Sequence, residues 1–153
     1  MEEKIEIKRS LLKECLHQVA VKYETVSQII RSNKKALESE TKSSAGDKHE
    51  TGRAVLQLEM EKASQQFAVV EKMQETLKRI SPEKLQETVA LGSVVITSGF
   101  NYYISVSLGE LSIGKDQYYA ISPQSPIGSL LMGKKSGDLI NFNGKEISIL
   151  EVF

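Results

Sequence analysis

Glycine and proline are distributed unevenly along this chain of 153 residues. Of the ten glycines, only Gly46 and Gly52 come before residue 81, and all three prolines come after it. Both residue types are disfavoured inside helices and frequent in turns. We therefore expect long helices in residues 1–80 and short elements joined by turns in residues 81–153. The boundary is expected at Ser81–Pro82, because proline disfavours helical geometry at the residue before it.

The first part of the chain carries two runs in which apolar residues recur in alternating steps of four and three. A period of 3.5 residues is typical of the seam of a left-handed coiled coil. The first run comprises Leu12, Leu16, Val19, Tyr23, Val26, Ile30, Asn33 and Leu37. The second run comprises Leu56, Met60, Ala63, Phe67, Val70, Gln74 and Leu77. Asn33 is the polar exception in the first run, and we interpret it as a seam residue that fixes the register.

Turn-forming and small polar residues separate the two runs, over residues 39–47. Two helices joined by a short break are expected to lie antiparallel, as a helical hairpin. We expect the first helix from about Ile7 to Glu40 and the tip of the hairpin near residues 41–50. The same heptads also allow an alternative, in which the coil forms between copies of the chain.

Composition excludes several classes of protein. Lys and Arg together number 20, as do Asp and Glu, so the net charge is zero, which argues against a nucleic-acid binder acting by bulk positive charge. Cys15 is the single cysteine, so neither an internal disulfide nor a cysteine-based zinc cluster is expected, and we interpret it as a small buried apolar residue. The sequence shows no apolar run long enough for a membrane span and no signal peptide, so we expect a cytoplasmic protein.

The second part of the chain predicts an antiparallel-rich sheet with one short helix, an α+β domain. The expected strands are rich in β-branched and aromatic residues, and they cover 94–96, 102–106, 117–122, 139–142 and 146–152. Asn143-Gly144 predicts a two-residue hairpin turn between the last two. Ser125 and Pro126 suit the start of a helix, and Gly133 suits the position after its end. The sheet-facing residues of that helix are expected to be Ile127, Leu130 and Leu131.

The tip of the hairpin carries two carboxylates, Asp47 and Glu50, which would share one face of the second helix's first turn. Carboxylate oxygens are suitable ligands for Mg²⁺. The same pattern is also typical of a capping box, in which Asp47 accepts a hydrogen bond from the residue-50 amide and Glu50 reaches back. Both roles remain open, because a capping carboxylate has a second oxygen.

A longer stretch resembles a known family. The run Ile121-Ser122-Pro123-Gln124-Ser125-Pro126-Ile127-Gly128, continued by Leu131-Met132-Gly133-Lys134-Lys135-Ser136-Gly137-Asp138, is similar to the C-terminal domain of the GreA/GreB transcript cleavage factors. Gly46, Asp47 and Glu50 also match the spacing of that family's tip motif. The following Thr51, Arg53 and Ala54 differ from it.

The resemblance implies an architecture and a function. The architecture is an N-terminal coiled-coil hairpin (residues 1–80) followed by a small FKBP-like docking domain (residues 81–153). The function is that of a bacterial elongation factor that binds RNA polymerase, inserts its tip in the secondary channel and stimulates cleavage of backtracked transcripts. The resemblance gives Asp47 and Glu50 the role of holding a shared Mg²⁺ and a water in the polymerase site, so the factor is not itself an enzyme and has no cofactor of its own.

Two further sets of residues follow from this interpretation. Basic side chains near the tip would contact the transcript or the polymerase, namely Lys34, Lys35, Lys42, Lys48 and Arg53, although a merely solvated charged face is equally consistent with them. Docking of the C-terminal domain is assigned to Ser125, Pro126, Gly133 and Lys134. We expect a monomer that contacts RNA polymerase and transcript RNA but no membrane.

Two other functions stay open at this point. The first is a regulator that enters the same channel without stimulating cleavage. The second, from a different class, is a coiled-coil assembly protein whose hairpin pairs with itself and whose tip carboxylates only cap a helix.

Overall fold

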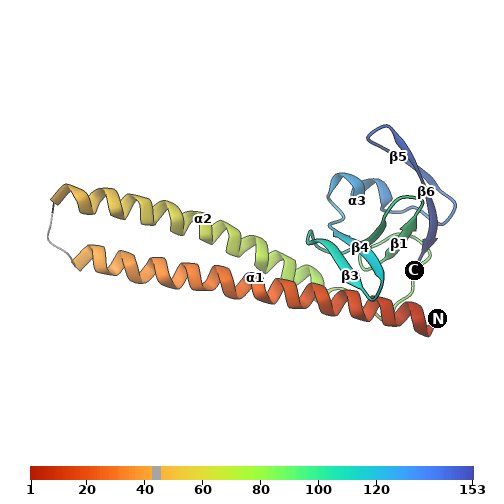
Figure 1. Cartoon of the computed structure of the whole chain (residues 1–153), viewed down its shortest axis with the longest axis horizontal. Helices are drawn as coiled ribbons and strands as arrows, with labels where there is room; N and C mark the ends of the chain where they lie inside the picture. Colours follow the sequence, from red (N-terminus) through yellow and green to blue (C-terminus); the bar gives the residue numbers. More distant parts are fainter. Residues whose placement is uncertain (43–45) are drawn as a thin grey trace. The chain divides into compact units, whose positions relative to one another are not determined.

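The computed structural model describes residues 1–42 and 46–153, with side chains described outside residues 40–50. Two long helices open the chain, α1 (Glu2–Lys42) and α2 (Gly46–Lys78), as Figure 1 shows in red to green. The first helix begins five residues earlier than expected and ends two residues later. The chain forms two compact units, one made of residues 19–74 and the other of residues 1–18 with 75–153. The expected boundary between residues 80 and 81 falls just after α2 and stays a prediction.

The unit of residues 19–74 is a helical hairpin with a seam of the expected period. Val19 and Val26 of α1 are buried, as are Ala63 and Val70 of α2. The rings of Tyr23 and Phe67 lie 5.2 Å apart between their centroids and fix the antiparallel register of the two helices. The apolar seam therefore forms within the chain, as predicted.

Asn33 occupies a buried seam position, as expected, with only 9% of its surface exposed. Its Nδ2 group finds no hydrogen-bond partner among the described residues. A buried amide donor without a partner destabilises the folded state, so Asn33 is an unfavourable polar group within an otherwise apolar seam.

The first turns of α1 bury a different stripe from the one expected. Leu16 is 47% exposed, whereas Lys8, Leu11 and Cys15 are buried. The physical reason is a change of partner, because this part of α1 packs against the C-terminal domain, where Cys15 Sγ lies 3.8 Å from Ser105 Oγ. The prediction that Leu16 is a buried seam residue was therefore wrong, whereas Leu12 is half-buried.

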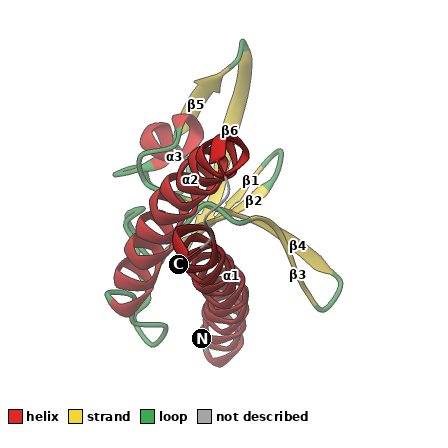
Figure 2. Cartoon of the chain, turned by 90° about the vertical axis from the view of Figure 1, so that its left-hand side faces the viewer, coloured by secondary structure: helices red, strands yellow, loops and turns green. Residues whose placement is uncertain are grey.

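The C-terminal domain holds six strands: β1 (Val94–Thr97), β2 (Asn101–Ile104), β3 (Gly109–Ile113), β4 (Asp116–Ile121), β5 (Leu139–Phe142) and β6 (Lys145–Val152). They form one sheet in the order β3-β4-β2-β1-β6-β5. All neighbouring strands are antiparallel except β2 and β4, which are parallel. The β3–β4 and β5–β6 hairpins lie at opposite edges of the sheet, drawn in yellow in Figure 2.

Two details of this domain refine the prediction. The edge strand β3 was not expected, since glycine begins it and only Leu111 of its five residues is buried. The Asn143-Gly144 turn is confirmed, because both residues have positive φ, 52° and 79°, as a tight hairpin turn of that composition requires.

The short helix α3 (Pro126–Leu131) covers part of one face of the sheet. Ile127 and Leu131 pack into a core with Val95, Ile104 and other apolar residues. Leu130, expected to face the sheet, is instead 37% exposed. A helix of fewer than two turns buries only a narrow stripe, and positions 127 and 131, four residues apart, fill it.

Candidate functional site

The predicted tip, residues 41–50, includes the end of α1 at Lys42 and the start of α2 at Gly46, and its residues 43–45 lie outside the described residues. Asp47 and Glu50 are therefore the second and fifth residues of α2, three positions apart in the helix. The side chains of Lys42, Asp47, Lys48 and Glu50 lie outside the described residues, so their roles as ligands, caps or contacts stay predictions. Because both positions lie in α2 and are three residues apart, they are neighbours on the helix surface.

Of the basic residues predicted near the tip, Lys34, Lys35 and Arg53 have described side chains, and all three are exposed. Arg53 follows Glu50 by three positions along α2. Residues three apart are neighbours on a helix surface. The guanidinium is therefore available to solvent on the side of α2 that also carries position 50.

No group of three or more His, Cys, Asp or Glu side chains gathers within the described part of the chain. Asp47 and Glu50 fall outside that search. His17 is exposed on α1, and His49 lies outside the described residues.

Ser125 and Pro126 form the start of α3 in the way the sequence predicts. Ser125 Oγ accepts a hydrogen bond from the Gly128 amide at 3.1 Å and donates one to the Ser122 carbonyl at 2.7 Å. Pro126 is the first residue of the helix, where its missing amide hydrogen is not needed. The capping prediction is confirmed, whereas docking by these two residues stays a prediction.

Gly133 and Lys134 end the same helix and bind it to the segment that precedes β1. Gly133 has a φ of +80°, a conformation that glycine adopts without strain. Its amide donates to the Val89 carbonyl at 2.9 Å, and the Val89 amide donates to the Lys134 carbonyl at 2.9 Å. Each of the four predicted docking residues therefore lies at an end of α3. Ser125 and Pro126 form its start, and Gly133 forms the turn after its end.

Cys15 behaves as the small buried residue expected from the sequence. Its side chain is fully buried, and this burial raises the pKa of the thiol to about 11. A thiol with that pKa is almost entirely protonated at neutral pH, and the thiolate is the reactive form. Cys15 is therefore a packing residue.

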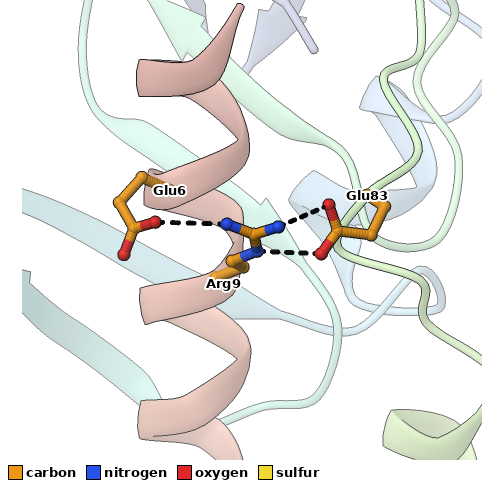
Figure 3. Close-up of polar contacts among 3 residues, drawn as sticks. All are labelled: Glu6, Arg9 and Glu83. Atoms are coloured by element: carbon orange, nitrogen blue, oxygen red, sulfur yellow. Dashed lines mark hydrogen bonds and ion pairs between the residues drawn. The ribbon is translucent and has the colours of Figure 1, made fainter.

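Two polar contacts of α1 with the segment after α2 were not anticipated. Lys8 is fully buried and donates from Nζ to the Lys84 carbonyl at 2.6 Å. The guanidinium of Arg9 pairs with Glu83 and also contacts Glu6, as Figure 3 shows. The sequence contains a signal for this buried stripe, because Lys8, Leu11 and Cys15 follow helical spacing. The signal is easily missed, since a lysine at such a position usually keeps its charged group in water.

The tip and the docking residues belong to different units of the structure. Asp47, Glu50 and Arg53 lie in the hairpin of residues 19–74, and Ser125 to Lys134 lie in the unit that contains the sheet. In the part of the chain that is described, none of the helices is both long and apolar enough to cross a membrane.

Comparison with known families finds no match for this sequence, and none of the curated proteins matches it. Among solved structures, the chain is similar to one described as "Structure of the transcription factor Gfh1". The two are 19% identical, and the alignment covers 92% of each chain with a TM-score of 0.33.

Proposed function

We propose that the chain is a Gre-type elongation factor that binds RNA polymerase and stimulates cleavage of backtracked transcripts. The observation that carries the proposal is the order of parts along one chain. An antiparallel hairpin holds Gly46, Asp47 and Glu50 at its turn, and a following α+β domain contains the Ser125-Pro126-Ile127-Gly128 run as a capped helix start. The Gre resemblance found in the sequence includes both of these features in this order.

The proposed chemistry is shared with the polymerase. Asp47 and Glu50 supply hard oxygen donors of the kind that Mg²⁺ prefers. When bound, the metal would help to activate a water and to stabilise the leaving oxygen of the transcript. Two carboxylates are an incomplete ligand set, so the proposal takes the remaining ligands from the polymerase and makes this chain a contributor of side chains rather than an enzyme.

The decisive experiment is transcript cleavage by a stalled, backtracked RNA polymerase with and without the protein. We expect shortened transcripts with the wild type and none above background with an Asp47→Ala, Glu50→Ala double variant. A matched control removes two carboxylates elsewhere on α2, Glu61→Ala and Glu71→Ala, which should leave cleavage unchanged. Normal stimulation by the tip variant would contradict the carboxylate role.

A second candidate is a regulator that enters the same channel without stimulating cleavage. The departures at Thr51, Arg53 and Ala54 favour it, because the exposed Arg53 adds positive charge one turn from Glu50. This candidate predicts polymerase binding without transcript shortening. Competition with a known cleavage factor for the polymerase would then separate it from a protein that does not bind at all.

A further inference from the structure

One flank of the helical hairpin is apolar and hollow. A groove of about 380 Å³ runs between α1 and α2, with Val21, Val69 and Met73 among the residues along it. Val21 is 52% exposed and Val69 is 56% exposed, so the groove opens to solvent through apolar walls. Exposed aliphatic side chains gathered on one face are typical of contact surfaces.

The groove belongs to a longer stripe on α2. Met73, Val69 and Gln66 follow the alternating steps of four and three, and the same steps continue to Lys62, Glu59 and Val55. Val55 is 50% exposed. The stripe therefore has valines on both sides of one acidic and one basic residue.

The register of the hairpin places one residue of α1 beside the centre of this stripe. Because Tyr23 packs on Phe67 and the helices are antiparallel, Ile29 lies level with position 61. Ile29 follows Thr25, a groove residue, by four positions, and it is 41% exposed. We call the set Ile29, Val55, Glu59, Lys62 and Val69 the apolar flank.

The opposite flank of the hairpin has a different character. It is built from charged and small residues, and an ion pair joins Arg31 to Glu24 at 3.2 Å. Across residues 20–38 and 57–71 this opposite flank carries no large apolar side chain; its members are Ala20, Glu24, Ser27, Arg31, Lys34, Glu38, Gln57, Glu61, Ser64, Ala68 and Glu71. Leu58, which is 67% exposed, belongs to neither flank. The other strongly exposed aliphatic residues of the hairpin, Val21, Ile29, Val55 and Val69, line the groove or belong to the apolar flank.

The charges of the apolar flank are complementary to themselves under a two-fold rotation. A two-fold axis between Glu59 and Lys62 brings each Glu59 against Lys62 of a second copy, with α2 antiparallel to its counterpart. Ile29 then lies close to the axis, and Val55 and Val69 lie on either side of it. Isologous contacts of this kind use the same patch twice.

We propose that the apolar flank is a self-association surface, on which two hairpins pair antiparallel through α2. The two charge pairs set the register, and the aliphatic residues provide the buried area. Few large side chains take part, so the dimer is a weak and reversible one that forms as the protein concentration rises. The proposal is independent of the polymerase-binding function.

The charge pairs give the sharpest test. Sedimentation equilibrium of the full-length protein across a concentration series should show a monomer–dimer equilibrium. Glu59→Lys and Lys62→Glu should each weaken the dimer by about tenfold, because each creates two like-charge contacts. The swapped double variant E59K/K62E should restore the dimer, and an equimolar mixture of the two single variants should form a heterodimer.

Variants of the apolar residues separate this surface from the rest of the hairpin. Val69→Ser should shift the equilibrium toward monomer, whereas Ala68→Ser on the opposite flank should leave it unchanged. Circular dichroism would confirm that each variant keeps its helical content. A wild type that stays monomeric at its highest soluble concentration would overturn the proposal, as would a dimer that the charge reversals do not weaken or the charge swap does not restore.

Discussion

Arg9 and Glu83 form a bidentate ion pair, with Nε donating to one carboxylate oxygen and a terminal guanidinium nitrogen to the other, each at 2.8 Å. The pair joins the third turn of α1 to the segment that follows α2. The hydrogen bond with Glu83 raises the pKa of Arg9, and the charge of Glu83 adds to the effect. Both partners are exposed, so the contact is accessible to solvent and salt.

The first prediction concerns this pair. Arg9→Lys keeps the charge but loses the planar fork, so we expect a lower urea midpoint than the wild type in dilute buffer. The difference should shrink at high salt, because exposed charges are screened. Arg31→Lys is the matched control, since Arg31 makes a single contact with Glu24 at 3.2 Å and should show a smaller change. An Arg9→Lys effect independent of salt would contradict an electrostatic origin.

The second prediction concerns the buried lysine. Burial, with a smaller contribution from the charge of Lys84, lowers the pKa of Lys8 to about 8. The unfolded chain, with a pKa near 10.5, then binds more protons than the folded chain between pH 8 and 10.5. The unfavourable contribution of Lys8 is thus fully present below pH 8 and disappears as the pH rises toward 10.5.

Lys8→Met removes this pH dependence. We expect the variant to be more stable at pH 7 by about 1 kcal/mol, because relief of the buried charge exceeds the loss of the hydrogen bond to the Lys84 carbonyl. The gain should vanish above pH 10. Urea unfolding at several pH values measures it, with the exposed Lys13→Met as control, and a gain that grows with pH would show the sign to be wrong.

The third prediction concerns the close approach at α3. A Cβ added to Gly128 would collide with the Ser122 carbonyl and would also lie 2.7 Å from Ser125 Oγ. We expect Gly128→Ala to destabilise the domain by about 3 kcal/mol, since the backbone must shift and the helix cap is disturbed. Ser129→Ala, on the exposed side of α3, is the control. Equal melting temperatures for Gly128→Ala and wild type would exclude the collision.

The fourth prediction concerns the polar seam residue. Asn33→Leu replaces a buried amide whose Nδ2 is unpaired within the described residues, so we expect the hairpin to gain about 1–2 kcal/mol. Hydrogen exchange should show greater protection of amides in residues 26–37 and 53–63. Asn33→Asp is the contrasting variant and should reduce protection. Loss of protection in Asn33→Leu would instead assign Asn33 a favourable polar contact.

Local patterns were sufficient to predict most of the fold. The capped helix from Ser125 to Gly133 was predictable because each residue there satisfies a short-range requirement of the backbone. The seam through Val26 and Val70 was predictable because both helices keep the same partner. Leu16 was misassigned because α1 contacts a sheet at its start, and periodicity alone does not reveal the partner of a helix. Strand β3 escaped notice because it has a single fully buried side chain, Leu111.

For the candidate site, the sequence predicted the helical positions of the two carboxylates but not the apolar flank. The positions of Asp47 and Glu50 within a helical turn follow from sequence and are consistent with α2 beginning at Gly46. The apolar flank was missed, although its spacing is visible in the sequence. The seam and the flank have the same period, so only the exposed fractions of Ile29, Val55 and Val69 distinguish a surface stripe from a core stripe.

The low reactivity of the Cys15 thiol makes this chain convenient for spectroscopic labelling. Its thiol is buried and its pKa is raised to about 11, so maleimide reagents at neutral pH would find almost no thiolate there. A cysteine introduced at the exposed Arg53 would therefore carry a fluorophore selectively, with the natural cysteine left in place. One such dye near the hairpin tip would report on polymerase binding, and energy transfer between donor- and acceptor-labelled copies would report on pairing.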